Sequence, residues 1–297
     1  MDLGIVAMAS WGDVIISTII PKVYKDQRPD TKITFYTSSA CAGALLNNPS
    51  IDNLVVIPAS KDHSWAIQDS IIADARKKHE KVITPWAGFT PQCDWIPLNR
   101  PGWDYEFHPN FMWATVRTAQ SEGLAVPNPP VIYLYPWPEE IENANKFVAS
   151  LNNGRRKVIM EVEGQSGQSW MRQSWIDPIM TVFMEKWKDV DLLISKGGDE
   201  SPEIAAAKAK WPGRVHLMNK LSLREVSVVF NSCDAFIGCS SGTGNACHTH
   251  LCKKNILWFE TVKDRLWDSW PLRPYGKFYH RSEDPQTFFD LIRNNVK

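Results

Sequence analysis

The sequence predicts an α/β protein of two domains, each built on a parallel β-sheet with helices on both faces. Three observations lead to this prediction. The chain of 297 residues is long enough for two compact domains. Short apolar segments alternate with longer amphipathic segments in both halves, which is the pattern of a parallel sheet with crossover helices. A proline-rich stretch at 126–138 separates the two series.

In the first half, apolar or β-branched residues gather in short runs, and longer segments with helical spacing lie between these runs. The predicted strands are 3–8, 32–37, 54–58 and 81–84, and the predicted helices are 14–25, 39–47, 65–80 and 111–123. The regular pattern stops at 85–109, which is rich in Pro, Trp, Asn and Gly. Irregular stretches of this length in a compact domain are often functional.

The second half repeats the alternation and ends on a helix. Its predicted strands are 131–135, 157–161, 191–195, 214–218, 235–238 and 255–259, and its predicted helices are 139–151, 175–187, 202–210, 222–231 and 285–294. Ser222, followed three residues later by Glu225, is a capping box at a helix start. We therefore expect two Rossmann-like domains, at 1–130 and 131–297.

Composition excludes some function classes. Lys+Arg and Asp+Glu both number 33, so the net charge is zero, which argues against a nucleic-acid binder. The first twenty residues have no basic n-region, and their apolar stretch is too short to span a membrane. We expect a cytoplasmic protein with reduced thiols and no integral membrane segment. The 14 Trp suit core packing and also stacking on sugar rings, for which Trp86 and Trp103 are candidates.

The first polar motif, Trp11-Gly12-Asp13, follows the first predicted strand. Open α/β sheets bind ligands at the carboxyl ends of their strands. Gly12 allows a tight turn, and Asp13 could accept a proton from a hydroxyl group as a general base. Asp is also common near helix starts, so position alone favours neither interpretation of Asp13.

A second motif is rich in glycine and hydroxyl residues and lies between a predicted strand and a helix start. It consists of Ser240, Ser241, Gly242, Thr243, Gly244 and Asn245. Backbone N–H groups at such a turn suit a phosphate or diphosphate, although glycines also occur there for purely conformational reasons. The first turn of the chain lacks Gly-x-Gly-x-x-Gly, which argues against a nicotinamide dinucleotide.

Two further motifs follow predicted strands of the second half. Arg172 could bind phosphate with its planar guanidinium, or lie solvated on the surface. Gly197, Gly198 and Glu200 end the next strand, and Glu200 could hold ribose hydroxyls or be an ordinary surface carboxylate. We interpret Arg172, Gly197, Gly198 and Glu200 as donor-binding candidates.

Cysteine and histidine residues gather within twenty positions near the last motif. They are Cys233, Cys239, Cys247, His248, His250 and Cys252. Zinc uses these ligands, but the spacings form no Cys-x-x-Cys pair and no repeated ligand pair. We predict buried thiols and polar histidines and no metal site; a zinc protein is the alternative.

Several segments, in the right order, resemble the heptosyltransferases of glycosyltransferase family 9. They are 12–18 (GDVIIST), 29–35 (PDTKITF), 48–52 (NPSID), 172–175 (RQSW), 194–198 (ISKGG), 221–225 (LSLRE), 233–238 (CDAFIG) and 241–242 (SG). The resemblance covers most of the chain and is weakest at about 85–130, the region that would face the acceptor.

The resemblance implies a GT-B fold, in which two Rossmann-like domains face each other across a cleft. It also implies inverting, metal-independent transfer of a sugar from a nucleotide diphosphate sugar, a co-substrate rather than a cofactor, to a hydroxyl of a glycan or glycolipid. Asp13 would be the base, Trp11 and Gly12 would lie on the acceptor side, and Arg172 and the 240–245 loop would hold the donor. A peripheral membrane contact is compatible with such an acceptor.

The sequence departs from the family at two donor-loop positions. Ser240 stands where the family usually has Asp or Asn, and Asn245 stands where it usually has His. Both residues can form hydrogen bonds but carry no charge, so the donor need not be ADP-heptose. Two alternatives are a nucleotide-sugar epimerase of the same fold and a non-catalytic sugar- or nucleotide-binding protein.

Overall fold

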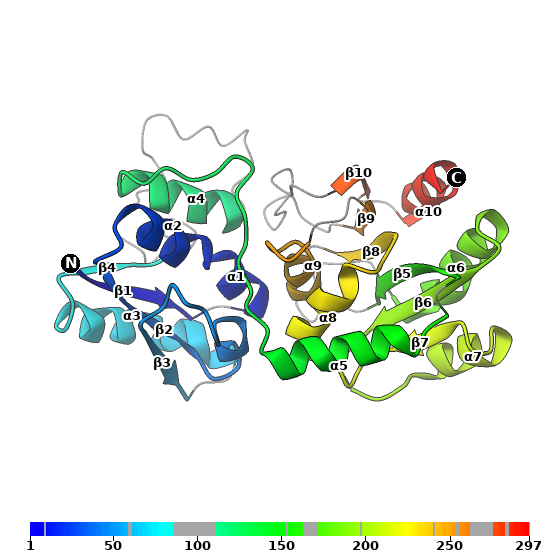
Figure 1. The fold of residues 1–297 in the computed structure, drawn as a ribbon, viewed down its shortest axis with the longest axis horizontal. Coiled ribbons are helices and arrows are strands. Elements are labelled where there is room, and N and C mark those ends of the chain that lie inside the picture. Colours follow the sequence, from blue (N-terminus) through cyan, green and yellow to red (C-terminus); the bar gives the residue numbers. More distant parts are fainter. Residues whose placement is uncertain are drawn as a thin grey trace. The chain divides into compact units, whose positions relative to one another are not determined.

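The structure is a computed structural model, and the described part of the chain has several gaps. It comprises residues 1–8, 10–58, 61–85, 111–152, 154–162, 172–196, 198–239, 241–252, 256–261, 276–282 and 285–296. The described residues form two compact units, residues 1–136 and the residues from 137 onward. Each unit has its own β-sheet (Figure 1).

The first unit contains a four-stranded parallel sheet. Its strands are β1 (Asp2–Ala7), β2 (Lys32–Ser38), β3 (Asn53–Ile57) and β4 (Lys81–Ile83), in the order β3-β2-β1-β4. All of its pairings are parallel. The chain moves outward from β1 to β3 and then returns to the other side of β1 for β4. The direction of winding therefore reverses between β1 and β4.

Helices connect and cover these strands. They are α1 (Trp11–Ile16), α2 (Ile19–Gln27), the 3₁₀ turn η1 (Ala42–Ala44), α3 (Lys61–Arg76) and α4 (Phe111–Ser121). The α3 helix packs on β1, β2 and β4, and α4 packs against α1 and α2. Leu3, Ile5 and Phe35 are fully buried in this unit, as expected for strands covered on both faces.

Two predicted helices of the first half are wrong. The helix at 14–25 is two helices, because the Ser17 and Thr18 hydroxyls donate to the carbonyls of Val14 and Ile15, and Pro21 has no N–H. The helix at 39–47 is only η1, and it ends before Asn47, which has a positive φ of 61°.

The strand predicted at 131–135 is also absent. These residues run without regular structure apart from an isolated bridge at Ile132. The N–H of Tyr133 donates to the Thr18 hydroxyl at 2.9 Å, so a side chain of the α1–α2 break takes the place of a strand partner.

The second unit contains a six-stranded parallel sheet. Its strands are β5 (Arg156–Glu161), β6 (Val190–Ser195), β7 (Val215–Leu217), β8 (Ala235–Cys239), β9 (Ile256–Thr261) and β10 (Gly276–Ser282), in the order β10-β9-β8-β5-β6-β7. This is the strand order of a Rossmann sheet, and the winding reverses between β5 and β8. The sequence pattern did not predict β10.

Residues of alternating parity on these strands face two separate cores. Val158, Met160 and Ile237 belong to a cluster with α6 (Ile176–Lys186) and α10 (Pro285–Asn295). Ile159 and Phe236 belong to a second cluster, with α5 (Pro138–Ala149), α8 (Leu223–Phe230) and α9 (Gly242–Cys247). The sheet is therefore buried on both faces.

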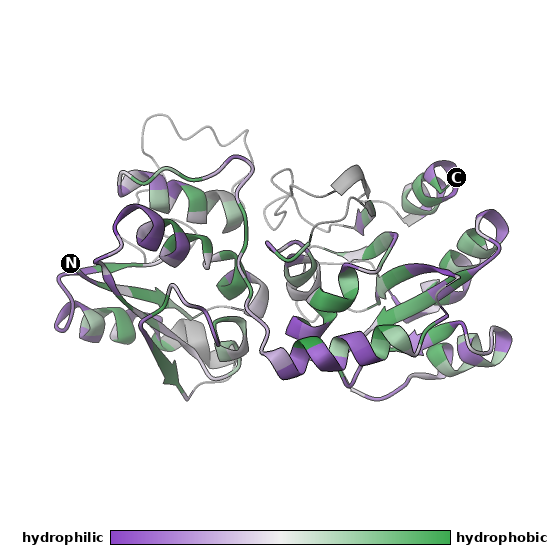
Figure 2. Ribbon diagram, viewed as in Figure 1, coloured by the Kyte–Doolittle hydropathy of each residue, from purple (hydrophilic) through white to green (hydrophobic). Residues whose placement is uncertain are grey.

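The remaining helical elements of this unit are α7 (Pro202–Lys210) and the 3₁₀ turn η2 (Gln173–Trp175). In Figure 2, α5 carries alternating hydrophilic and hydrophobic bands, as expected for a helix with one face on a sheet. The predicted capping box of α8 is confirmed, since the N–H of Glu225 donates to Ser222 Oγ at 3.2 Å and the N–H of Ser222 donates to Glu225 Oε2 at 2.6 Å.

The predicted fold class is confirmed: two α/β units, each with a parallel sheet and flanking helices. Within the described ranges, no helix is both long and apolar enough to cross a membrane.

Candidate functional site

Three of the predicted site residues, Asp13, Arg172 and Ser241, follow strands at the points where the two sheets reverse their winding. At such a point the two adjoining connections diverge, which leaves a crevice outside the carboxyl ends of the strands, and open α/β sheets bind ligands there. In the first unit this point is the end of β1, from which the chain leads to Asp13. In the second unit it is the end of β5 and β8, from which the chain leads to Arg172 and to Ser241.

Asp13 lies in the first turn of α1, and its side chain is partly exposed. Its Oδ2 accepts a hydrogen bond from the Ser10 hydroxyl at 2.5 Å and from the Ser10 N–H at 3.2 Å. Ser10 is the residue before the helix, so the carboxylate also has the capping role that the sequence left open. A carboxylate accepts several hydrogen bonds, so capping does not exclude contact with a ligand.

The two residues before Asp13 shape the turn. Gly12 is buried, and Trp11 is half-buried. A Cβ atom added at Gly43 would lie 3.5 Å from the indole nitrogen of Trp11, so this ring reaches the η1 turn. The other two acceptor candidates, Trp86 and Trp103, lie outside the described residues.

In the second unit, Ser241 is the N-cap of α9. Its Oγ accepts the Gly244 N–H at 3.1 Å, and its carbonyl accepts the Asn245 N–H at 2.9 Å. The side chains of Thr243 and Asn245 are 7% and 5% exposed, whereas Ser241 and Gly242 are partly exposed. The solvent-accessible part of the turn is therefore Ser241–Gly242. Ser240 lies outside the described residues.

Glu161 is a candidate site residue that the sequence analysis missed. It is the last residue of β5 and is 5% exposed. Its Oε2 accepts hydrogen bonds from the Ser241 hydroxyl and, at 3.4 Å, from the Cys239 thiol. Burial raises the pKa of this carboxyl to about 7, although hydrogen bonds from Ser241, Thr243 and Cys239 oppose the shift. The available signal was one acidic residue ending an otherwise apolar strand.

Gly238 provides the space for this carboxyl. A Cβ atom at Gly238 would lie 3.2 Å from the Glu161 Cβ and 2.5 Å from the Phe236 ring, so a side chain would displace one of them. On the other side of Gly238, Glu260 is fully buried and accepts the Trp258 indole N–H at 3.0 Å. Two buried carboxyl groups thus flank a strand position that has no side chain.

The other donor-binding candidates of this unit are at its surface. Arg172 is exposed and precedes η2. Gly198 has a positive φ of 76°, which explains glycine at this position, and its carbonyl accepts the Asn219 side-chain N–H at 3.1 Å. Glu200 pairs with Lys208 at 3.1 Å. Gly197 lies outside the described residues.

The cysteines near α9 belong to the core. Cys233, Cys239, Cys247 and Cys252 are buried, and His248 stacks on Trp258 with ring centroids 3.9 Å apart. In the part of the chain that the structure describes, no three His, Cys, Asp or Glu side chains are arranged to hold a metal ion.

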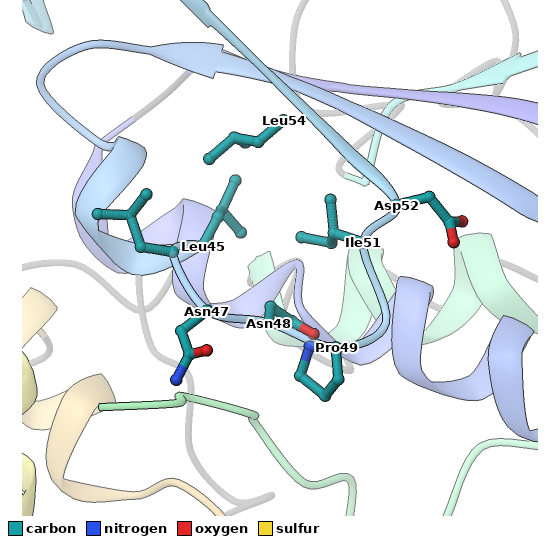
Figure 3. A pocket seen from close by; sticks show the side chains of 8 residues that line it. Leu45, Asn47, Asn48, Pro49, Ile51, Asp52 and Leu54 are labelled. Carbon is teal, nitrogen blue, oxygen red and sulfur yellow. The ribbon is translucent and has the colours of Figure 1, made fainter. Parts of the chain in front are cut away.

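A pocket of about 360 Å³ in the first unit is lined by residues that follow the η1 turn. Its lining residues are Leu45, Leu46, Asn47, Asn48, Pro49, Ile51, Asp52 and Leu54. In Figure 3, Leu45, Ile51 and Leu54 surround it, while Asp52 points away. Asp52 accepts hydrogen bonds from Lys25 Nζ and from the Ile33 N–H at 2.9 and 2.6 Å. This carboxylate therefore stabilises the β2–β3 connection.

Comparison with solved structures gives matches over the whole chain. The glycosyl transferase family 9 protein of Veillonella parvula has a TM-score of 0.66 at 14% identity, over 100% of this chain and 92% of that one. The ADP-heptose lipopolysaccharide heptosyltransferase II of E. coli has a TM-score of 0.63 at 14% identity, over 100% and 96%. The E. coli heptosyltransferase WaaC with ADP has a TM-score of 0.60 at 14% identity, over 95% and 91%.

No protein-family model and no curated protein sequence matches the chain. The structural matches confirm the predicted resemblance to family 9 at the level of the fold, which is the GT-B fold of glycosyltransferases. At 14% identity they do not assign the reaction.

Proposed function

We propose that this chain is a glycosyltransferase that moves a sugar from a nucleotide diphosphate sugar to an acceptor hydroxyl, with inversion at the anomeric carbon. The observation that carries the proposal is the whole-chain match to family 9 folds, at TM-scores of 0.60 to 0.66. The positions of Asp13 and Ser241 support it, because each follows a strand at the point where its sheet reverses winding.

On the acceptor side, Asp13 is the general base. Its partly exposed carboxylate takes the proton of the acceptor hydroxyl while that oxygen attacks the anomeric carbon from the face opposite the diphosphate. The Ser10 hydrogen bonds fix the carboxylate in the first turn of α1. Trp11 and Gly12 border the acceptor. The acceptor is a hydroxyl of a glycan or glycolipid.

On the donor side, the diphosphate lies against the Ser241–Asn245 turn and the Arg172 guanidinium. Negative charge grows on the diphosphate as the glycosidic bond breaks, and fixed N–H donors and a cation stabilise that charge. In this proposal protein groups do this without a metal ion. Glu200 is placed to bind ribose hydroxyls, in exchange for its contact with Lys208.

A thermal-shift screen with ADP-, UDP-, GDP- and dTDP-sugars tests the donor class, because a ligand that binds the native state raises its apparent stability. The sugar that stabilises the chain is then incubated with the protein and a panel of glycan acceptors. We expect release of the nucleoside diphosphate to require an acceptor. Conversion of the donor alone into an epimer would contradict sugar transfer, and stabilisation by none of these ligands would contradict a nucleotide-sugar site.

A donor-site variant distinguishes loss of donor binding from a folding defect. Arg172 is exposed, so Arg172→Gln should leave the unfolding free energy within about 0.5 kcal/mol of wild type. The same change should weaken binding of the stabilising nucleotide sugar by about tenfold or more, since a charge-assisted phosphate contact is worth about 1.5–3 kcal/mol. Lys186→Gln, also exposed, is the matched control.

A further inference from the structure

The buried carboxyl group of Glu161 has no role in the mechanism above. It ends β5 on the sheet face that α8 and α9 cover, and it contacts Cys239 at the end of β8 and, after that strand, Ser241 and Thr243. Burying a carboxyl group is unfavourable unless its oxygens are hydrogen-bonded. Of these partners, Ser241 and Thr243 belong to the turn that the proposed function assigns to the donor diphosphate.

The hydrogen bonds of Ser241 depend on the proton of Glu161. A serine hydroxyl has one proton to donate and two lone pairs that accept. One lone pair of Ser241 Oγ accepts the Gly244 N–H at 3.1 Å. When Glu161 is ionised, it accepts the single Ser241 proton. When Glu161 is protonated, its own O–H can donate to the second lone pair of Ser241, and the Ser241 proton can be given to another acceptor.

We propose that Glu161 is a proton-linked positioning residue, whose protonated form releases the Ser241 hydroxyl to bind the donor diphosphate and whose ionised form retains that hydroxyl. The inference rests on the proposed function, since it concerns the same turn. The proton comes from solvent on binding and returns to solvent on release, so no other reactant is needed.

Two physical effects support this linkage. Burial raises the pKa of Glu161 to about 7, so both protonation states are populated near neutral pH. A bound diphosphate brings negative charge to the turn that contacts Glu161, which favours the neutral carboxyl further. Donor binding should therefore take up a proton at Glu161, and donor affinity should fall as the pH rises above 7.

Other ionisable groups occur on the described elements packed around Glu161. The Cys239 thiol on β8 donates to Glu161 itself, and Glu260 on β9 accepts the Trp258 indole N–H. Cys247 and His248 are buried at the end of α9, and Lys196 after β6 donates to the Asp199 carbonyl. These groups remain in a Glu161→Gln variant, so comparison with that variant isolates the contribution of Glu161.

The test measures nucleotide-sugar binding between pH 6 and pH 8 by calorimetry. The probes are ADP-, UDP-, GDP- and dTDP-glucose, in which both phosphates are esterified. A free nucleoside diphosphate is unsuitable, because its terminal phosphate titrates near pH 6 to 7 as phosphate monoesters do. Each titration is repeated in two buffers of different ionisation enthalpy, which gives the number of protons taken up. The proteins are wild type, Glu161→Gln and the exposed control Glu185→Gln.

For wild type and Glu185→Gln, we expect affinity to fall about tenfold from pH 6 to pH 8, because only the protonated fraction binds. About one proton should be taken up per bound nucleotide sugar at pH 8, and close to none at pH 6. Glu161→Gln is permanently neutral and can donate its amide N–H to Ser241, so its affinity should change less than about twofold over this range.

Equal wild-type affinity at pH 6 and pH 8, or the same pH dependence in Glu161→Gln, would overturn the inference while leaving the proposed function intact. If no probe binds any of the three proteins at any pH, the proposed function fails and the inference fails with it. If Glu161→Gln does not fold, the proton count of wild type at pH 8 decides alone, and a count near zero overturns the inference.

Discussion

The turn after β1 in the first unit and the turn after β8 in the second share one arrangement. Each begins with a serine N-cap, Ser10 or Ser241, whose hydroxyl donates to a carboxyl group. The carboxyl groups differ in origin and in surroundings. Asp13 comes from the same turn and is partly exposed, whereas Glu161 comes from the neighbouring strand β5 and is buried.

The different surroundings suit these two carboxyl groups to different roles. An exposed carboxylate keeps lone pairs available to a ligand, which suits proton abstraction from an acceptor hydroxyl. A buried carboxyl group of raised pKa changes its protonation state near neutral pH, which suits control of a neighbouring hydroxyl. The account therefore assigns chemistry to the first turn and donor binding to the second.

The largest expected effect is that of Asp13→Asn on turnover. The amide cannot take a proton from the acceptor, so kcat for sugar transfer should fall about a thousandfold. Donor affinity should be unchanged, because the donor contacts lie in the second unit. Steady-state kinetics and calorimetry measure the two quantities, with Asp26→Asn on the exposed side of α2 as the control. Turnover within twofold of wild type would remove Asp13 from the mechanism.

The second effect is on stability at alkaline pH. The folded-state pKa of Glu161 is about 7, above the reference value of 4.5 for the unfolded chain, so the folded state binds this proton more tightly. The stability that this proton gives to the folded state is fully present below pH 4.5 and is lost as the pH rises through 7. At pH 8 the free energy of unfolding of Glu161→Gln should therefore be up to about 3 kcal/mol higher than that of wild type.

Below pH 4.5 the Glu161→Gln variant and wild type should be nearly equal in stability. Urea unfolding at pH 4.5, 6 and 8 measures the difference, and Glu185→Gln should follow wild type throughout. If Glu161→Gln is less stable than wild type at pH 8, burial of the Glu161 carboxyl group does not destabilise the folded state.

The third effect compares the two cap serines directly. Ser10→Ala should reduce the free energy of unfolding by about 1 kcal/mol, since water can replace the lost bond to the partly exposed Asp13. Ser241→Ala should reduce it by about 2 kcal/mol at pH 7, because it also leaves Glu161 buried without its hydroxyl donor. Urea unfolding of both variants provides the test, and equal losses would show that burial does not distinguish the two turns.

The smallest effect concerns the surface contact between Glu200 and Lys208, whose side chains are 34% and 44% exposed. Lys208→Met should change the unfolding free energy by less than about 0.5 kcal/mol, as for most exposed ion pairs. Glu200→Gln should change stability as little, yet weaken binding of the stabilising nucleotide sugar severalfold. Calorimetry with both variants measures the affinity for the nucleotide sugar and the unfolding free energy separately. Unchanged affinity in Glu200→Gln would exclude Glu200 from the donor site and leave only the residues that follow β5 and β8.

Much of the fold could be predicted because strand and helix periodicity is local information. The strands at 32–37 and 191–195 centre on short runs of apolar, aromatic or β-branched residues, and they are confirmed within one residue as β2 and β6. The helix at 39–47 was wrong because a glycine and a positive φ at Asn47 outweigh its apolar spacing. The strand at 131–135 was wrong because its backbone bonds a side chain on the α1–α2 break.

The candidate site was predicted only where its residues are contiguous. Asp13 and the 240–245 loop follow strands directly, so their place at the sheet edge follows from the order of elements. The contact of Glu161 with Ser241 joins residues eighty positions apart. It depends on β5 and β8 being neighbours and on Gly238 leaving space, and neither fact is visible in local spacing.

The most direct test of the account measures the affinity of the stabilising nucleotide sugar for wild type, Asp13→Asn and Ser241→Ala at pH 6 by calorimetry. The account predicts that Asp13→Asn binds within twofold of wild type, although its kcat for sugar transfer falls about a thousandfold. It also predicts that Ser241→Ala loses about tenfold or more in affinity, because a hydrogen bond to a charged group is worth about 1.5–3 kcal/mol. Loss of binding in Asp13→Asn with full binding in Ser241→Ala would reverse the two assignments and contradict the account.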